Sequence, residues 1–304
     1  MKVVVLSGGG GGARFARGMA EAVPAGNLTV IGNVGDDVEI IGLHVSPDLD
    51  SLLYTLAGLI DEERGWGRKG ESWNALAAAA AWGGEDWFRL GDLDIGLHLV
   101  RREMLDSGVP LSGVTAHLAG RASLSTRIIP ATEDRLRTYI RTAAGSFSFQ
   151  EWFVGRKHED DVDGVTYEGA AAARPAPGVV EALGDADAIV LAPSNPYLSI
   201  GPILAVRGIR EALESRRARS VAVSPLIGGK AVSGPLDRML SRMAGGTTPG
   251  HVTDCYLGLI DALVIDESDA PADGSVELVV TKTLMHDRES ASRLAETALE
   301  AACG

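Results

Sequence analysis

Short apolar runs alternate with amphipathic segments at both ends of the chain. Near the N-terminus, apolar runs at residues 3–6 and 28–32 flank a helical pattern over residues 13–22. This spacing is typical of a β-α-β unit, whose two strands pair in parallel. The same order returns later, with strands expected at 188–192, 221–224, 262–266 and 276–281, a helix at 209–216 and a closing helix at 288–301.

The middle of the chain has a different pattern. Helical periodicity covers residues 52–60, 93–106 and 111–118, and alternating aromatic and β-branched residues then predict strands at 147–154 and 164–168. We therefore expect one α/β domain spanning residues 1–304, a Rossmann-like parallel sheet with helices on both faces. Its core comes from 1–60 and 181–304, and an inserted cap of helices and β-structure occupies about 61–180.

Composition narrows the class of protein. With 304 residues and 45% hydrophobic content, the chain can bury a full core. A net charge of -13 argues against a nucleic-acid partner and favours small molecules. Two cysteines are too few for a disulfide framework, and neither a signal peptide nor a membrane-spanning run is recognisable. We expect a cytoplasmic enzyme that binds no membrane.

A glycine run follows the first strand. Residues 7–12 read Ser-Gly-Gly-Gly-Gly-Gly, and glycine lets backbone N–H groups close on an anion. Gly8, Gly10 and Ala13 also fit the G-x-G-x-x-A spacing of dinucleotide-binding turns, although this run fits several registers. Ala13 and Arg14 stand where a Walker A loop needs lysine and a hydroxyl residue. We predict a phosphate site, with an empty strand-to-helix turn as the alternative.

Four aspartates lie around the junction after the second strand: Asp36, Asp37, Asp48 and Asp50. Paired acidic residues are usually solvated, but their position after a strand is where ligands bind in open α/β sheets. Carboxylates suit Mg²⁺, and one of them could accept a proton from an attacking hydroxyl. We predict that at least one of these aspartates binds a ligand.

Two further junctions carry polar groups. Residues 193–202 place Ser194, Asn195 and Ser199 between prolines, which indicates a rigid binding loop. Residues 224–235 present Lys230 within a glycine turn, where it could contact phosphate or simply be exposed. The six histidines lack metal-ligand spacing, no G-x-S-x-G elbow is present, and the tryptophans are more typical of core than of a ligand pocket.

Taken in order, the motifs resemble the 2-phospho-L-lactate transferase family of coenzyme F420 biosynthesis, and especially its actinobacterial phosphoenolpyruvyl transferase branch. The matching segments run nearly end to end: 8–15, 33–37, 46–50, 53–56, 63–67, 86–92, 149–153, 192–196, 199–204 and 224–230. Many archaeal members have threonine where Gly10 and Val34 stand here. The segments at 71–73 and 130–134 follow the bacterial branch, which favours an enolpyruvyl donor.

The resemblance implies a reaction and its substrates. Family members join Fo, a deazaflavin bearing a ribityl chain (7,8-didemethyl-8-hydroxy-5-deazariboflavin), to a phosphorylated three-carbon acid carried on GMP. They release GMP and use Mg²⁺ as cofactor. The ribityl hydroxyl would attack the phosphate, so no protein nucleophile is required. The family also implies a homodimer, and phospholactyl or phosphoglyceryl donors stay open beside enolpyruvyl phosphate.

The resemblance also assigns roles to individual residues. The guanylate and phosphate site is expected at Gly9, Gly10, Gly11, Gly12, Ser194, Asn195, Gly201, Gly229 and Lys230. Metal and base roles fall to Asp37 and Asp50, with Asp36 and Asp48 in reserve and Asp48 as a further metal ligand. Fo is expected against Asn33, Trp87, Asp92 and His98.

Two other functions compete with the transferase. The first is a non-enzymatic protein of the same superfamily that binds a nucleotide sugar and regulates cell-wall metabolism. Such a protein would need the glycine turn, but it would not need a cap that binds a deazaflavin. The second is a nicotinamide-dependent oxidoreductase, because Asp36 or Asp37 could imitate the acidic ribose partner that follows a G-x-G-x-x-A turn.

Overall fold

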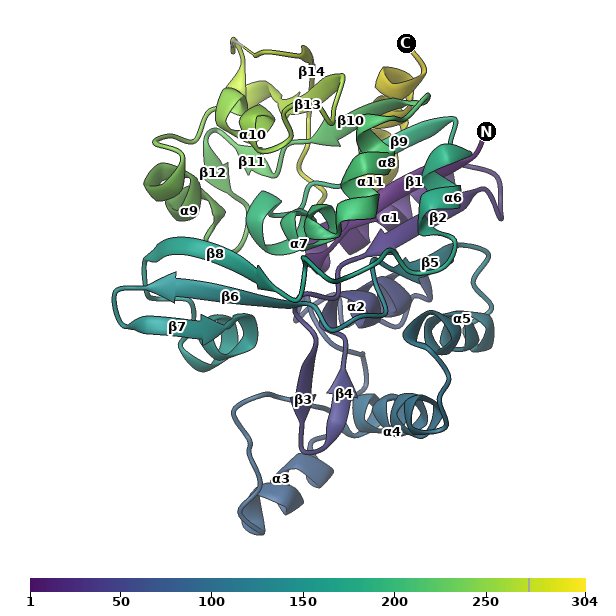
Figure 1. Ribbon diagram of the computed structural model, residues 1–304, viewed down its shortest axis with the longest axis vertical. Helices are drawn as coiled ribbons and strands as arrows, with labels where there is room; N and C mark the ends of the chain where they lie inside the picture. The colour runs from purple at the N-terminus through teal and green to yellow at the C-terminus, as the bar shows by residue number, and fades with distance from the viewer. Residues whose placement is uncertain (273) are drawn as a thin grey trace.

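A seven-stranded parallel sheet forms the centre of the protein, as the computed structural model of residues 1–272 and 274–304 shows (Figure 1). Neighbouring strands follow the order β14-β13-β10-β9-β1-β2-β5, and every pair is parallel. The strands are β1 (Val3–Ser7), β2 (Leu28–Gly32), β5 (Arg127–Pro130), β9 (Ala188–Leu191), β10 (Arg219–Val223), β13 (Ala262–Asp266) and β14 (Glu277–Thr281).

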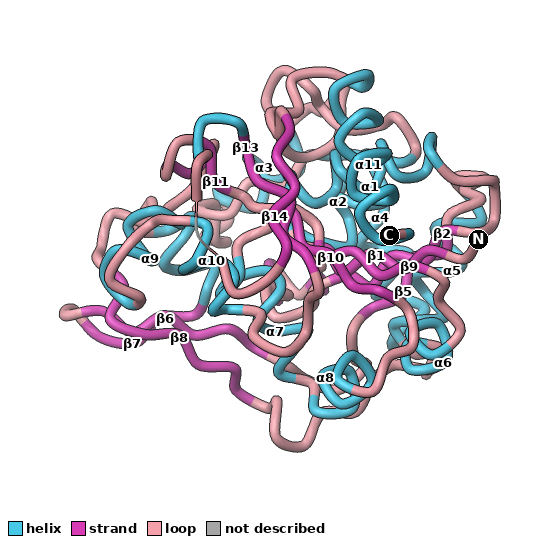
Figure 2. Tube along the Cα trace, turned by 90° about the horizontal axis from the view of Figure 1, so that it is seen from above, coloured by secondary structure: helices cyan, strands magenta, loops and turns pink. Residues whose placement is uncertain are grey.

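The inner strands are buried on both faces. Every residue of β1, β9 and β13 is buried, and these strands are apolar apart from Ser7 and Asp266 at the ends of β1 and β13, because helices cover the sheet on either side. Figure 2 shows α1 (Gly9–Ala22), α2 (Pro47–Leu56) and α11 (Arg288–Cys303) on one face. The opposite face carries α6 (Val179–Gly184), α7 (Gly201–Ala205) and α8 (Arg207–Glu214). The predicted α/β fold is confirmed.

The side of the sheet on which the chain adds new strands changes between β1 and β9. The chain extends the sheet from β1 to β2 and β5 on one side, and from β9 to β10, β13 and β14 on the other. The segment after β1 forms α1 on one face, whereas the segment after β9 leads to α7 and α8 on the opposite face. Such a switch point leaves a crevice at the carboxyl ends of the two strands.

The remaining elements surround that crevice. The hairpin β3 (Val38–Ile40) and β4 (Leu43–Val45) extends below the sheet toward α3 (Asn74–Ala81) and α4 (Asp92–Asp106), and α5 (Leu111–Arg121) packs near β5 (Figure 1). A separate antiparallel sheet has the order β7-β6-β8. The other elements are β6 (Arg137–Thr142), β7 (Gly145–Ser148), β8 (Val162–Glu168), β11 (Leu226–Ile227), β12 (Lys230–Ala231), α9 (Leu236–Met243), α10 (Pro249–Cys255), π-helices Glu151–Gly155 and Pro196–Ile200, and a 3-10 helix, Glu267–Asp269.

Two expectations differ from the structure. Only the start of the strand predicted at 147–154 is extended, in β7, and Glu151–Gly155 is helical instead. The aromatic residues Phe149, Trp152 and Phe153 are spaced three and four apart, which suits a helix, and they pack together with Trp152 fully buried. The predicted cap at 61–180 also contains β5, which pairs with β2 in the main sheet.

No helix among residues 1–272 and 274–304 is long and apolar enough to cross a membrane.

Candidate functional site

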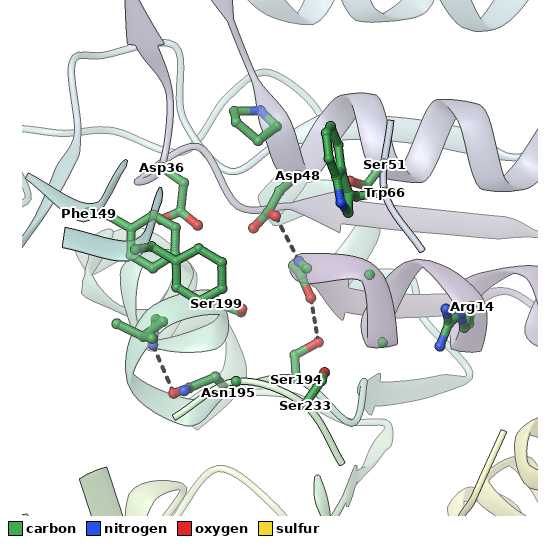
Figure 3. Close-up of a pocket in the computed structure, with 18 of the residues that line it drawn as sticks. Arg14, Asp36, Asp48, Ser51, Trp66, Phe149, Ser194, Asn195, Ser199 and Ser233 are labelled. Atoms are coloured by element: carbon green, nitrogen blue, oxygen red, sulfur yellow. Dashed lines mark hydrogen bonds between the residues drawn. The ribbon is translucent and has the colours of Figure 1, made fainter. Parts of the chain in front are cut away.

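A cavity of about 660 Å³ lies at the switch point between β1 and β9. Its walls come from the start of α1, from α2 and α4, from the segment between α3 and α4, and from the loops after β9, β10 and β14. This volume is within the range of small-molecule sites. Figure 3 shows Asp48 and Ser194 approaching the glycine turn from opposite sides.

The glycine run forms the first turn of α1. Gly9 has a positive φ of 69°, and its N–H donates to Asp48 Oδ1 at 2.8 Å. Ser194 Oγ donates to the carbonyl of Gly8 at 2.8 Å, so the loop after β9 fixes the same turn. Gly9, Gly10 and Gly11 line the cavity where the first N–H groups of a helix lack intrahelical acceptors. This end of α1 is therefore suited to an anion.

Asp48 anchors the turn from α2. Its Oδ2 accepts from Asn33 Nδ2 at 2.9 Å, and Asn33 Oδ1 accepts from the N–H of Gly35 at 2.7 Å. Burial raises the pKa of Asp48 to about 6 despite these hydrogen bonds. Burial, followed by the charge of Asp48, raises the pKa of Asp36 well above its ordinary value. Both carboxyl groups line the cavity, and they crowd negative charge there.

Asp37 and Asp50 lie in different surroundings. Asp37 does not line the cavity, and its Oδ2 is 3.0 Å from both His44 Nε2 and Ser46 Oγ. Asp50 accepts from both terminal nitrogens of Arg101, one of them at 3.0 Å, in a buried ion pair. Burial favours the neutral acid, but the Arg101 guanidinium lowers the pKa of Asp50 below its ordinary value.

His98 completes the α4 side of this group. Its Nδ1 is 3.1 Å from Arg101 Nη1 and 4.0 Å from Asp50 Oδ2. Burial lowers the pKa of His98 to about 4, so the ring is neutral near pH 7. The ring lines the cavity beside Asp50.

The structure brings ten of the predicted site residues to the cavity wall: Gly9, Gly10, Gly11, Asp36, Asp48, Asp50, Trp87, His98, Ser194 and Asn195. Asn195 does so from a fixed position, because its side-chain oxygen accepts from the N–H groups of Tyr197 and Leu198 at 2.9 and 3.1 Å. This contact caps the π-helix Pro196–Ile200. The loop after β9 is therefore rigid, as its prolines indicate.

Seven other predicted residues do not line this cavity. Besides Asp37, they are Gly12, Asn33, Asp92, Gly201, Gly229 and Lys230. Gly12 packs against Ser7 and Ser194, and Gly201 packs against Tyr167. Asp92 accepts from the N–H groups of Asn74 and Ala75 at the start of α3. Gly229 donates to Asp269, and the exposed Lys230 lies 3.5 Å from Asp237.

Several cavity residues were missed by the sequence analysis. Arg14, Tyr54, Asp94, Phe149 and Phe153 all line it. Tyr54 is one helical turn after Asp50, and Asp94 is one turn before His98, so helical spacing was the available signal. Arg14 likewise follows Gly10 by four residues on α1.

The carboxylate oxygens of the site meet part of what a magnesium ion requires. Asp36 Oδ1 and Asp37 Oδ1 are buried and have no hydrogen-bond partner within the described residues. Those residues include no cluster of three or more metal-ligating side chains. Mg²⁺ commonly uses one or two carboxylates and completes its shell with water and substrate phosphates. Of the two, Asp36 lines the cavity together with the glycine turn, so its free oxygen suits that pattern.

Comparison with known proteins identifies close relatives. The family model for 2-phospho-L-lactate transferase CofD matches residues 3–302. The chain is 42% identical to a phosphoenolpyruvate transferase of Streptomyces griseus subsp. griseus, over 99% of this chain and 98% of the relative. It is 43% identical to one of Kitasatospora aureofaciens, over 98% and 97%.

A solved structure shares the fold at lower sequence identity. It is a protein member of the UPF0052 family from Bacillus halodurans, 18% identical, with a TM-score of 0.63 and 98% of each chain covered.

Proposed function

Because the chain belongs to the 2-phospho-L-lactate transferase family of coenzyme F420 biosynthesis, we propose that it transfers a phosphorylated three-carbon acid from a GMP-linked donor to Fo. The relatives named phosphoenolpyruvate transferase favour the enolpyruvyl donor. The product would be the phosphodiester dehydro-F420-0, with GMP released. Family membership removes the support for a nicotinamide-dependent oxidoreductase.

The glycine turn carries this proposal on the structural side. A helix start free of side chains faces the cavity, and Ser194, which hydrogen-bonds to this turn, and Asn195 line the cavity beside it. The phosphates of the donor would bind to the N–H groups of Gly9, Gly10 and Gly11, since a helix N-terminus favours negative charge. Catalysis would then rest on positioning and on charge neutralisation.

We infer that Mg²⁺ would bind at Asp36, which lines the cavity. Its free oxygen would hold the ion, because Asp48 already binds the turn and Asp50 is neutralised by Arg101. When bound, the ion would neutralise charge on the transferring phosphate. Asp50 then serves to hold Arg101 and His98 in place, instead of binding metal directly.

Asp48 is the proton acceptor that the geometry favours. It lies beside Gly9, where the phosphate would bind, and its pKa of about 6 leaves it ionised and more basic than an ordinary carboxylate near pH 7. The ribityl hydroxyl oxygen of Fo would attack the phosphorus that bears the three-carbon acid. The P–O bond to GMP would break, and the hydroxyl proton would pass to Asp48.

Aromatic side chains give the acceptor a place to bind. Trp87 and Phe88 lie edge to face, with ring centroids 5.7 Å apart, and both line the cavity on the cap side. Phe149 and Phe153 stack at 5.1 Å in another part of the wall. Flat heterocycles bind well against such surfaces.

Incubation with Fo, Mg²⁺ and each GMP-linked donor tests the proposal. Mass spectrometry of the deazaflavin should show the mass of the enolpyruvyl phosphodiester, and GMP should appear in equal amount. Omission of Mg²⁺, or substitution Asp48→Asn, should reduce the product by orders of magnitude. A protein that binds the donor yet modifies Fo with none of the three-carbon acids would disprove the transferase.

A further inference from the structure

An arginine that the proposed mechanism does not use lines the cavity on α1. Arg14 is half-buried there, and it forms no ion pair or hydrogen bond with any of residues 1–272 and 274–304. Arg17, three residues later on the same helix, pairs with Glu62 instead. An arginine side chain carries a positive charge and five N–H donors, so a guanidinium without a protein partner in a cavity wall is suited to an anionic ligand.

The guanidinium of Arg14 lies near the glycine turn. Arg14 follows Gly10 by four residues, a rise of about 6 Å along the helix, and helical side chains tilt toward the N-terminus. Gly65 is a neighbour of both residues. A Cβ on Gly65 would lie 3.5 Å from Arg14 Nη2, and a Cβ on Gly10 would lie 3.6 Å from the carbonyl oxygen of Gly65. Arg14 therefore reaches the part of the wall where the proposed function places phosphate.

Charge is distributed unevenly around this turn. Figure 3 shows Asp36 and Asp48 on one side of the glycines and Arg14 on the other side, farther along α1. The other arginine that lines the cavity within the described part of the chain is Arg89, from the segment between α3 and α4. The Arg89 guanidinium carbon is 4.6 Å from the ring centroid of Trp73. Arg14 is thus the arginine that stands at the anion-binding turn.

This distribution favours one orientation of a diphosphate on the turn. The phosphate that is transferred must face the Mg²⁺ ion and the proton acceptor, which the proposed function assigns to Asp36 and Asp48. The other phosphate of the donor, which leaves as part of GMP, would then lie on the Arg14 side. The reverse orientation would bring the departing phosphate toward the two carboxylates, and like charges repel each other.

We propose that Arg14 binds the leaving phosphate of the GMP-linked donor and stabilises the charge that develops on it during transfer. This inference rests on the proposed function, because it takes GMP as the leaving group. As the ribityl oxygen bonds to phosphorus, the bond from phosphorus to the bridging oxygen breaks, and its electron pair stays on that oxygen.

The leaving phosphate therefore gains one negative charge. It carries one charge as a diester-like group within the donor and two as the monoester GMP. The Arg14 guanidinium neutralises the added charge without transferring a proton, while the hydroxyl proton still passes to Asp48. Arg14 is then a catalytic residue, because it contacts a phosphate whose charge changes in the reaction.

Binding of GMP tests this contact on the full chain without turnover. Calorimetric titration with GMP and with guanosine, in Mg²⁺ at constant ionic strength, compares the wild type with Arg14→Gln and Arg14→Lys. Loss of hydrogen bonds between charged groups should weaken GMP binding about tenfold to a hundredfold in Arg14→Gln. Arg14→Lys should give an intermediate affinity, because lysine keeps the charge but not the planar fork of donors. Guanosine, which lacks the phosphate, should bind all three proteins equally.

Turnover gives a second measurement. The charge on the leaving oxygen is larger in the transition state than in the bound donor, so Arg14→Gln should lower kcat about a hundredfold or more and leave the KM for Fo unchanged. Arg121→Gln is the matched control. It removes an exposed arginine from the end of α5, outside the cavity wall, so GMP affinity and kcat should equal those of the wild type. Arg14→Gln breaks no ion pair, so its melting temperature should match that of the wild type.

The outcomes separate the two proposals. If Arg14→Gln binds GMP as tightly as the wild type while the wild type converts Fo, the role of Arg14 is wrong and the transferase stands. A raised donor KM with unchanged GMP affinity would likewise overturn this role and place Arg14 at the carboxylate of the three-carbon acid. Equal weakening of GMP and guanosine would also overturn it, because Arg14 would then act on the nucleoside or on cavity shape. If the wild type does not bind GMP, both proposals are wrong.

Discussion

Individual carboxylates in this site differ because their neighbours differ. Asp48 and Asp50 are two residues apart on α2, yet burial raises the pKa of Asp48 whereas Arg101 lowers that of Asp50. The sequence predicted that the aspartates would gather after β2, because that inference needs only strand order. It could not show which aspartate is neutralised, because Arg101 lies on α4 and reaches Asp50 only through tertiary packing.

Replacing Arg101 should reveal how much its pairing matters. Arg101→Leu leaves the buried Asp50 charge without its partner, which costs about 3–5 kcal/mol. Urea unfolding measures this loss. The adjacent Arg102→Leu is the control, because Arg102 forms solvent-exposed pairs with Glu39 and Asp106 that contribute little to stability. Similar losses for both variants would contradict a buried, stabilising Asp50–Arg101 pair.

At the scale of elements, the glycine run combines two requirements. The sequence predicted a phosphate turn before a helix at 13–22, and in the structure the glycines are themselves the first turn of α1. Gly8 is needed for packing, since a Cβ there would lie 2.6 Å from Asp48 Oδ2 and 2.8 Å from Ser199 Cβ. Gly10 faces more open space, because a Cβ there would lie 3.6 Å from the carbonyl oxygen of Gly65. Composition alone could not separate these roles.

Alanine substitutions should separate packing from ligand binding in this turn. Gly8→Ala should lower the free energy of unfolding by about 1–3 kcal/mol, because its neighbours must move. Gly10→Ala should keep or raise stability, since alanine favours a helix, but should raise the donor KM by adding a methyl group to the phosphate site. Thermal unfolding and steady-state kinetics measure the two effects. A destabilised Gly10→Ala with normal KM would contradict this division.

At the scale of the whole molecule, the strand pattern predicted most of the sheet. Six of its seven strands lie where apolar runs end in polar turns, because buried parallel strands are apolar on both faces. The seventh, β5, is a four-residue strand that begins with an exposed arginine, so its pattern is too short to detect. The cavity wall beyond the sheet depends on packing among distant segments, which explains why Tyr54 and Asp94 were missed.

The carboxylates crowded at the cavity predict a stability that depends on Mg²⁺. Mg²⁺ should raise the melting temperature at pH 7.5, because binding to the folded state neutralises the crowded carboxylates. The rise should shrink at pH 5.5. The raised pKa of Asp36 means that protons occupy this group and compete with the metal as the pH falls. Differential scanning fluorimetry at constant ionic strength measures the shift.

A charge-matched variant shows whether the effect is local. Asp36→Asn should abolish most of the Mg²⁺-dependent rise, whereas Glu300→Asn, which removes one exposed carboxylate from α11, should retain it. Equal shifts in both variants would mean that Mg²⁺ acts on the overall net charge of -13 and not at Asp36.

The switch point also has a consequence for protein synthesis. β1 is made first, but Val3 pairs with Ala188 of β9 on one edge and with Leu28 of β2 on the other. At typical translation rates, roughly ten to forty seconds separate the synthesis of β1 from that of β9. During that interval a strand whose first four residues are apolar has one unpaired edge, which is a site for aggregation. The same arrangement that creates the crevice therefore leaves β1 without one of its partners until β9 is made, and we expect the nascent chain to be prone to aggregation over that interval.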